Sequence, residues 1–265
     1  MTTSIEKMRA WRGPALLSYG YRPFFLLAAV WAALVMVVWI LVLSGLIGWT
    51  AAFDPVSWHA HSLLFGYSTA VIAGFLMTAV PNWTGRFPIV GWPLAGLVAL
   101  WLIGRLVVTL GFGLPAMAIA AIDLAFPVVF AVAIGREIVA GRNWRNLKVL
   151  ALLTLLIVAD LLFHIEAAQG GYAAGGLGAR LALATLILLI TLIGGRIVPS
   201  FTRNWLAQRR SAQLPAQADR GDDACMTITV VALLAWTVLP DHAITGALCL
   251  LAGIANVWRL LRWRG

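Results

Sequence analysis

The sequence predicts an all-α polytopic membrane protein, a transmembrane helix bundle of about eight spans with both termini cytoplasmic. Hydrophobic residues make up 62% of the 265 residues and charged residues only 11%, whereas soluble domains carry about 25% charged residues. The apolar runs reach about 20 residues, the length that crosses a bilayer. They lack the alternation of barrel strands. In lipid, a helix satisfies its own backbone hydrogen bonds, so helices are expected.

The apolar runs define the spans in order. The first run is too long for the core of a signal peptide and is read as a retained span. Pro81, Pro93 and Pro115 mark span edges, because proline interrupts helices. Residues 1–265 form a single membrane domain, in which the polar stretch 207–223 is a flexible cytoplasmic connection. The predicted spans are 24–47, 57–80, 93–111, 115–135, 147–165, 177–197, 224–240 and 242–258.

Basic residues between the spans give the orientation. Sixteen of them lie in the two termini and the even-numbered connections, and one, Arg180, lies on the other side. The positive-inside rule therefore places both termini in the cytoplasm. The formal charge of +9 reflects this topology and contact with lipid headgroups, and nucleic-acid binding is not expected. Cys225 and Cys249 form no CxxC pair and are read as packing residues.

All four histidines fall at the outer ends of predicted spans. His59 and His61 lie at the outer end of the second span, His164 at that of the fifth, and His242 at that of the eighth. Histidine is the commonest metal ligand and a usual axial ligand of haem. Metal sites in helix bundles are built from facing helices. The four residues are therefore candidate metal ligands, and the alternative for each is an interfacial or buried polar residue.

The spacing of the first histidine pair limits what it can bind. Asp54 and Pro55 are typical of a helix N-cap and first residue. Both histidines would then be helical, about 200° apart around the axis. Either the helix is irregular there, or His59 and His61 serve different sites.

Three further charges lie within the spans. Asp160 and His164 stand at i and i+4 on one helix face, as a carboxylate supporting a ligating histidine would, or as a simple polar patch. Arg105 and Asp123 lie at similar depth on adjacent antiparallel spans, so we expect them to pair. That pair is either structural or a contact to a haem propionate or a polar path.

Four stretches of the chain resemble the signature stretches of the NnrS family. They are "GYRPFFLLAAV" (20–30), "WHAHSLLFGYSTAVIAGFLMTAVPNWTGR" (58–86), "ADLLFHIEA" (159–167) and "GGRIVPSFTRNWL" (194–206). The resemblance implies a multi-pass protein of the bacterial inner membrane that carries haem and copper. It also implies a link to nitric oxide, denitrification and nitrosative stress. Family members usually continue for several more spans, so we expect a short or truncated member whose ligand set a partner copy in a homo-oligomer could complete.

The resemblance also implies roles for individual residues. His59, His61 and His164 are the candidates for metal and haem ligation. Other residues in or near the matching stretches would support the site or the fold, and these are Arg22, Asn82, Arg105, Arg196, Arg203 and Asn204.

Three functions are compatible with these features. The first is a haem and copper protein that binds or handles nitric oxide at an outer-leaflet histidine site. No second redox motif is visible, so no enzymatic activity is assigned. The alternative is a transporter or permease for a metal or small solute that uses Arg105, Asp123 and Asp160, although no matching pair of broken helices supports it. A membrane scaffold is the third.

Overall fold

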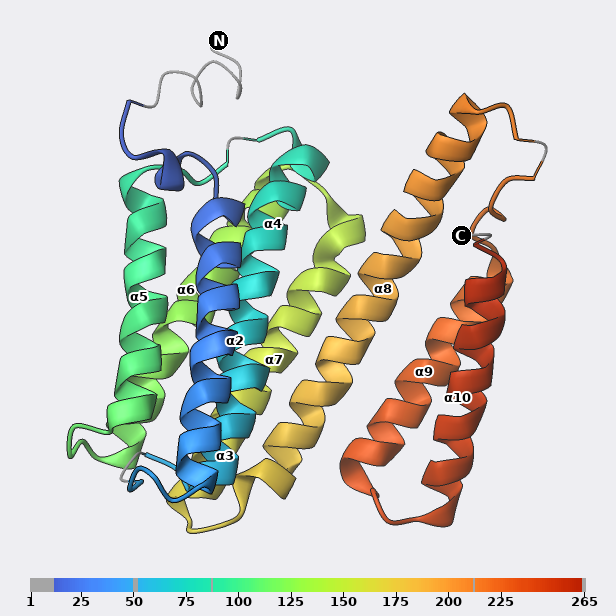
Figure 1. Ribbon diagram of the computed structural model, residues 1–265. Coiled ribbons are helices and arrows are strands. Elements are labelled where there is room, and N and C mark those ends of the chain that lie inside the picture. The colour runs from blue at the N-terminus through green and yellow to red at the C-terminus, as the bar shows by residue number, and fades with distance from the viewer. Residues whose placement is uncertain (1–11, 50–51, 87, 212, 264–265) are drawn as a thin grey trace. The chain divides into compact units, whose positions relative to one another are not determined.

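The computed structural model describes residues 12–49, 52–86, 88–211 and 213–263, and in these ranges it contains helices and no strands. Eight helices in the described residues are long and apolar enough to cross a membrane, which confirms the predicted all-α membrane fold (Figure 1). The helices are α2 (Tyr21–Leu43), α3 (Pro55–His61), α4 (Ser68–Thr84), α5 (Trp92–Leu110), α6 (Ala116–Ala140), α7 (Leu147–Ala168), α8 (Leu177–Gln208), α9 (Arg220–Val238) and α10 (Ala243–Leu261).

The second span is one helix made of three parts. α3 leads into a π-helical turn, η2 (Ser62–Tyr67), which leads into α4. Pro81 lies inside α4 rather than at its edge, so the sequence-based boundary was about one turn too early. The helix ends only at Gly85, whose φ of 67° turns the chain and lets its N–H donate to the carbonyl oxygen of Pro81. Glycine reaches this left-handed conformation without steric cost.

The sixth and seventh spans also differ from their predicted bounds. α8 continues to Gln208, eleven residues past the predicted end at residue 197. The apolar run measures the membrane thickness, whereas a helix can continue beyond it wherever its residues favour helix. α9 begins at Arg220 because the Asp219 carboxylate accepts hydrogen bonds from the backbone N–H groups of Gly221 and Asp222. The connection predicted as 207–223 is therefore helical at both ends.

The chain divides into two compact units, Met1–Ala182 and Leu183–Gly265. In the first unit α2 packs against α4, α4 against α6, and α6 contacts both α5 and α7. Large buried side chains fill the space between these helices, among them Trp58, Trp101, Phe24, Phe126 and Phe163. The turn of the chain into α3 lies at the end of this unit where α2 finishes (Figure 1).

In the second unit α9 and α10 form an antiparallel pair joined by polar contacts. The Asn256 amide donates to the Thr229 hydroxyl at 2.8 Å, and the Arg259 guanidinium donates to Asp222 at 2.8 Å. Such hydrogen bonds help to hold membrane helices together. At the polar end of the pair, Arg262 bonds to both carboxylate oxygens of Asp219.

The ion pair at the start of α9 predicts a pH dependence. The hydrogen bond from Arg262 holds the pKa of the Asp219 carboxyl below its ordinary value of 3.8. A lowered pKa in the folded state stabilises the helix start fully above that ordinary value, and this stabilisation is lost as the pH falls through the lowered pKa. We expect the protection of the Gly221 and Asp222 amides from hydrogen exchange, corrected for the intrinsic rate, to fall on acidification. Asp219→Asn should abolish the pH dependence. Equal protection at pH 6 and pH 2.5 in the wild type would contradict this.

Candidate metal centre

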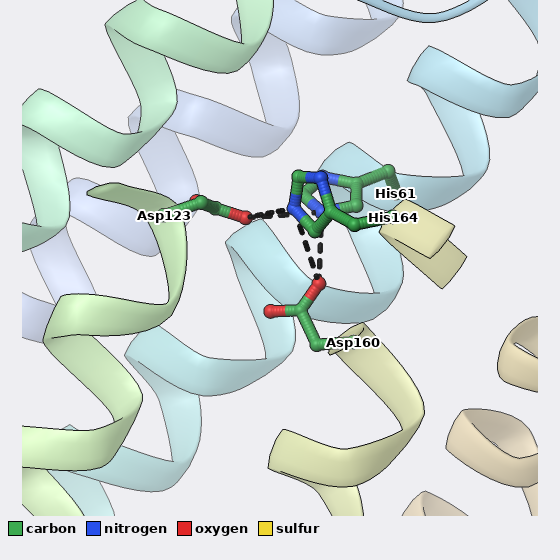
Figure 2. Close-up of side chains that lie close together, drawn as sticks. All are labelled: His61, Asp123, Asp160 and His164. Atoms are coloured by element: carbon green, nitrogen blue, oxygen red, sulfur yellow. Dashed lines mark hydrogen bonds and ion pairs between the residues drawn. The ribbon is translucent and has the colours of Figure 1, made fainter. Parts of the chain in front are cut away.

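Four side chains from three helices meet inside the first unit. His61 is the last residue of α3, Asp123 lies in the first half of α6, and Asp160 and His164 lie one turn apart on α7. Their exposed fractions are 0%, 0%, 2% and 2%. One ligand atom from each of the four lies within 4.8 Å of each of the others. Figure 2 shows the two imidazole rings turned toward both carboxylates. We refer to these four residues as the tetrad.

The distances within the tetrad are those of a shared polar centre. His61 Nε2 lies 3.1 Å from an oxygen of Asp123 and 3.0 Å from an oxygen of Asp160. His164 Nε2 lies 3.1 Å from the same Asp123 oxygen and 3.8 Å from the same Asp160 oxygen. Nitrogen and oxygen ligands about 2.0–2.2 Å from one metal ion are about 2.8–3.6 Å apart in tetrahedral or octahedral arrangements. Three of the four distances fall in this range and the fourth is slightly longer, so the tetrad fits a single metal ion.

Charge leads to the same conclusion. Two carboxylates lie in the tetrad, and the one arginine beside them, Arg105 on α5, forms an ion pair with Asp123. With neutral imidazoles the group carries one net negative charge, because the ion-pair partners of Asp160 among the described residues are His61 and His164 alone. An uncompensated charge away from water is costly. A bound cation would remove this cost.

The π-helical turn positions His61. A π turn inserts one extra residue into a helix and often marks a functional site. It also frees backbone carbonyls, and here two indole N–H groups use them: Trp31 donates to the carbonyl of Ser62 at 3.0 Å and Trp101 to that of Gly66 at 3.1 Å. The irregular turn that delivers His61 is therefore fixed from α2 and α5.

Two glycines allow the close packing around the ion pair. A Cβ on Gly104 of α5 would lie 2.8 Å from an Asp123 carboxylate oxygen, and one on Gly66 would lie 2.7 Å from both Arg105 and Trp31. Either side chain would displace the buried charges. The helices can therefore approach at these points only because both positions lack a side chain.

Aromatic rings enclose His61. The rings of Phe53, Phe65 and Phe163 lie 5.0, 5.1 and 5.4 Å from its imidazole. Its Nδ1 is buried without a hydrogen-bond partner among the described residues. Ligating histidines usually donate this second N–H to a partner. Here the ring orientation is set by packing instead, in a dry surrounding that strengthens electrostatic interactions.

Comparison with protein families identifies the chain. The family model described as NnrS protein matches residues 15–265. The chain belongs to the NnrS family. No curated protein and no solved structure matches it. Membership of the NnrS family, together with the buried tetrad, fits a metal-binding membrane protein.

The resemblance to the NnrS family implies two cofactors, copper and haem, and the geometry of the tetrad suits a single ion better than a haem. A single metal ion fits the tetrad. A haem does not fit there, because the Nε2 atoms that would bind iron already face carboxylate oxygens at 3.0–3.1 Å. No step of the chemistry is therefore assigned to haem at His61 or His164.

The four histidines that the sequence predicts as metal ligands lie in different surroundings. The tetrad contains His61 and His164 and excludes His59 and His242. His59 stacks on Trp39, with ring centres 4.5 Å apart, so the two neighbouring histidines do face different surroundings. His242 lies in the second unit, where its Nδ1 accepts the backbone N–H of Ile244 and caps α10. Ligation by His59 or His242 stays a prediction.

The predicted pairing of Arg105 with Asp123 is confirmed, and Asp160 does lie beside His164. The sequence pattern did not predict that both carboxylates join the histidines as candidate ligands. A signal was present: Asp123 follows the short loop after α5 by about two turns and so falls at the depth of His164.

Among the supporting residues, Arg22 and Arg203 donate to the backbone carbonyls of Ala15 and Pro215 at 2.9 and 3.1 Å.

Proposed function

We propose that this NnrS protein is a metal protein of the bacterial inner membrane that binds nitric oxide at a copper ion held by His61, Asp123, Asp160 and His164. The observation that carries the proposal is the convergence of two imidazoles and two carboxylates, with a single arginine beside them, in a buried group. Imidazole suits copper and iron, and carboxylate is a harder ligand that fits a divalent ion. Family membership supports the link to nitric oxide.

Copper bound in the tetrad would supply a centre that binds nitric oxide and changes its own charge by one electron. The chain supplies the rest. The imidazoles and carboxylates hold the ion, Arg105 offsets one carboxylate charge, and the phenyl rings of Phe53, Phe65 and Phe163 keep water away. Nitric oxide is apolar enough to enter from the bilayer, so the site needs no polar channel. Turnover would need a source of electrons and protons, so we propose binding and not a reaction.

A haem in this protein would have to be bound outside the tetrad. His59 is the candidate on the first unit, because it lies outside the tetrad, stacks on Trp39, and has its Nδ1 buried without a hydrogen-bond partner among the described residues. By the positive-inside rule, the tetrad lies near the outer leaflet.

The transporter alternative rests on Arg105, Asp123 and Asp160. These three residues belong to one buried, ion-paired group with the histidines. A group of this kind favours retention of an ion over its passage. The metal-protein function is therefore the better supported of the two.

A panel of histidine variants tests the proposal. His61→Ala and His164→Ala should each lose the bound copper and its EPR signal, because each removes one of four ligands. His242→Ala is the matched control and should keep both, since that ring caps α10. Copper content is measured by mass spectrometry on protein purified in detergent. Full copper content in both tetrad variants, or no copper in the wild type after expression with copper, would refute the proposal.

A further inference from the structure

A cavity of about 210 Å³ reaches the tetrad from outside. Its lining joins the segment before α3, the start of α6 and the end of α7, and consists of Ala52, Phe53, Ala116, Ile119, His164, Ala167 and Ala168. This cavity, in the part of the chain that the structure describes, has one residue of the tetrad, His164, in its lining. Ala116 and Ala168 are exposed, whereas Phe53, Ile119 and His164 are buried. The cavity therefore runs from the protein surface to the imidazole of His164.

The side chains around this cavity are apolar apart from His164. Three residues of α7, His164, Ala167 and Ala168, follow the i, i+3, i+4 pattern that places them on one helix face. Phe53 forms the wall between the cavity and the tetrad, because its ring lies 5.1 Å from His164 and 5.0 Å from His61. A lining without a fixed charge favours an uncharged molecule.

The size of the cavity restricts its occupant further. Drug-sized ligands occupy pockets of about 300–1,000 Å³, and a volume of 210 Å³ is below that range. It still exceeds the share of a single water molecule, about 30 Å³, several times over. The alanines keep this space open, since any larger side chain at their positions would fill it.

We infer that this alanine-lined cavity is the entry and binding pocket for a small uncharged molecule, which reaches the metal ion past His164 and Phe53. The inference rests on the proposed metal site and adds the route by which its ligand arrives. A charged ligand would meet apolar side chains, including the ring of Phe53.

The test compares two alanine variants on the same helix. Ala167→Leu fills the cavity, whereas Ala151→Leu makes the same change at an exposed position of α7. Nitric oxide is mixed with copper-loaded protein in a stopped-flow instrument, and the rate of the optical change is recorded beside the copper content. We expect Ala167→Leu to slow binding about tenfold or more, an added barrier of about 1.4 kcal/mol. Ala151→Leu should bind at the wild-type rate, and both should keep their copper.

Other outcomes separate the route from the metal site. Copper retained with an unchanged rate in Ala167→Leu would overturn the inference and leave the metal site intact. Absence of copper from the wild type would instead refute the proposed function. If Ala167→Leu fails to fold, Ala116→Leu fills the same cavity from α6, and a wild-type rate in that variant overturns the inference equally.

Discussion

Replacing Arg105 with glutamine is expected to destabilise the metal-free protein by about 3–5 kcal/mol, the cost of breaking a buried ion pair by removing one partner. Arg105 is 4% exposed and forms the ion pair with Asp123. Without it, two carboxylates would remain in a buried group with no arginine to offset either of them. The measurement is unfolding in detergent micelles, followed by tryptophan fluorescence after treatment with a chelator.

A matched variant isolates burial as the cause. Arg136→Gln removes an arginine that pairs with Glu137 at 3.2 Å but is itself largely exposed, and it should cost less than about 1 kcal/mol. The double variant Arg105→Gln/Asp123→Asn should recover part of the loss, because it leaves no unpaired arginine or carboxylate from this pair. Equal stabilities for Arg105→Gln and Arg136→Gln would show that the buried pair does not contribute as described.

Replacing Asp160 with asparagine should lower the affinity for copper about 100-fold or more. Removing a residue that only supports a metal ligand typically costs 10–100-fold, and Asp160 offers the tetrad both a candidate ligand oxygen and a carboxylate charge. Asparagine keeps the size and one oxygen, so the loss would report charge and ligation and not packing. Competition with a chelator of known affinity measures the change.

Asp54→Asn provides the control for this prediction. Asp54 caps α3, where it accepts the N–H groups of Val56 and Ser57 at 3.0 Å, and asparagine caps a helix about as well as aspartate. Affinity for copper should therefore stay at the wild-type value in Asp54→Asn. A wild-type affinity in Asp160→Asn would remove Asp160 from the ligand set.

The helices could be predicted from the sequence because lipid leaves the backbone few alternatives. Hydropathy located all eight membrane helices, and it missed ends such as that of α8 because helices continue past the apolar core. Turn length placed Arg105 and Asp123 at one depth, and the i, i+4 spacing placed Asp160 beside His164.

The composition of the tetrad could not be predicted in the same way. Whether two helices at one depth also turn the same faces toward each other depends on their rotation about their axes, which hydropathy does not determine. The rotation of α3 depends in addition on the π turn, for which no simple residue pattern exists. His59 and His61 therefore looked equivalent in the sequence, although only His61 joins the tetrad.

The π turn at Ser62–Tyr67 lets the second span contain one residue more than a regular α-helix would have over the same rotation. Each residue of an α-helix advances the chain by about 100°, and a π turn accommodates one residue more than an α turn does. A chain lacking that surplus residue could keep α4 unchanged and still span the bilayer. Its imidazole would still face Asp123, because the π turn absorbs the surplus residue and leaves the direction of His61 as it would be in a regular helix one residue shorter. A regular α-helix that kept every residue would instead turn His61 by about 100° away from the carboxylates, so the metal centre depends on the pairing of the surplus residue with the π turn.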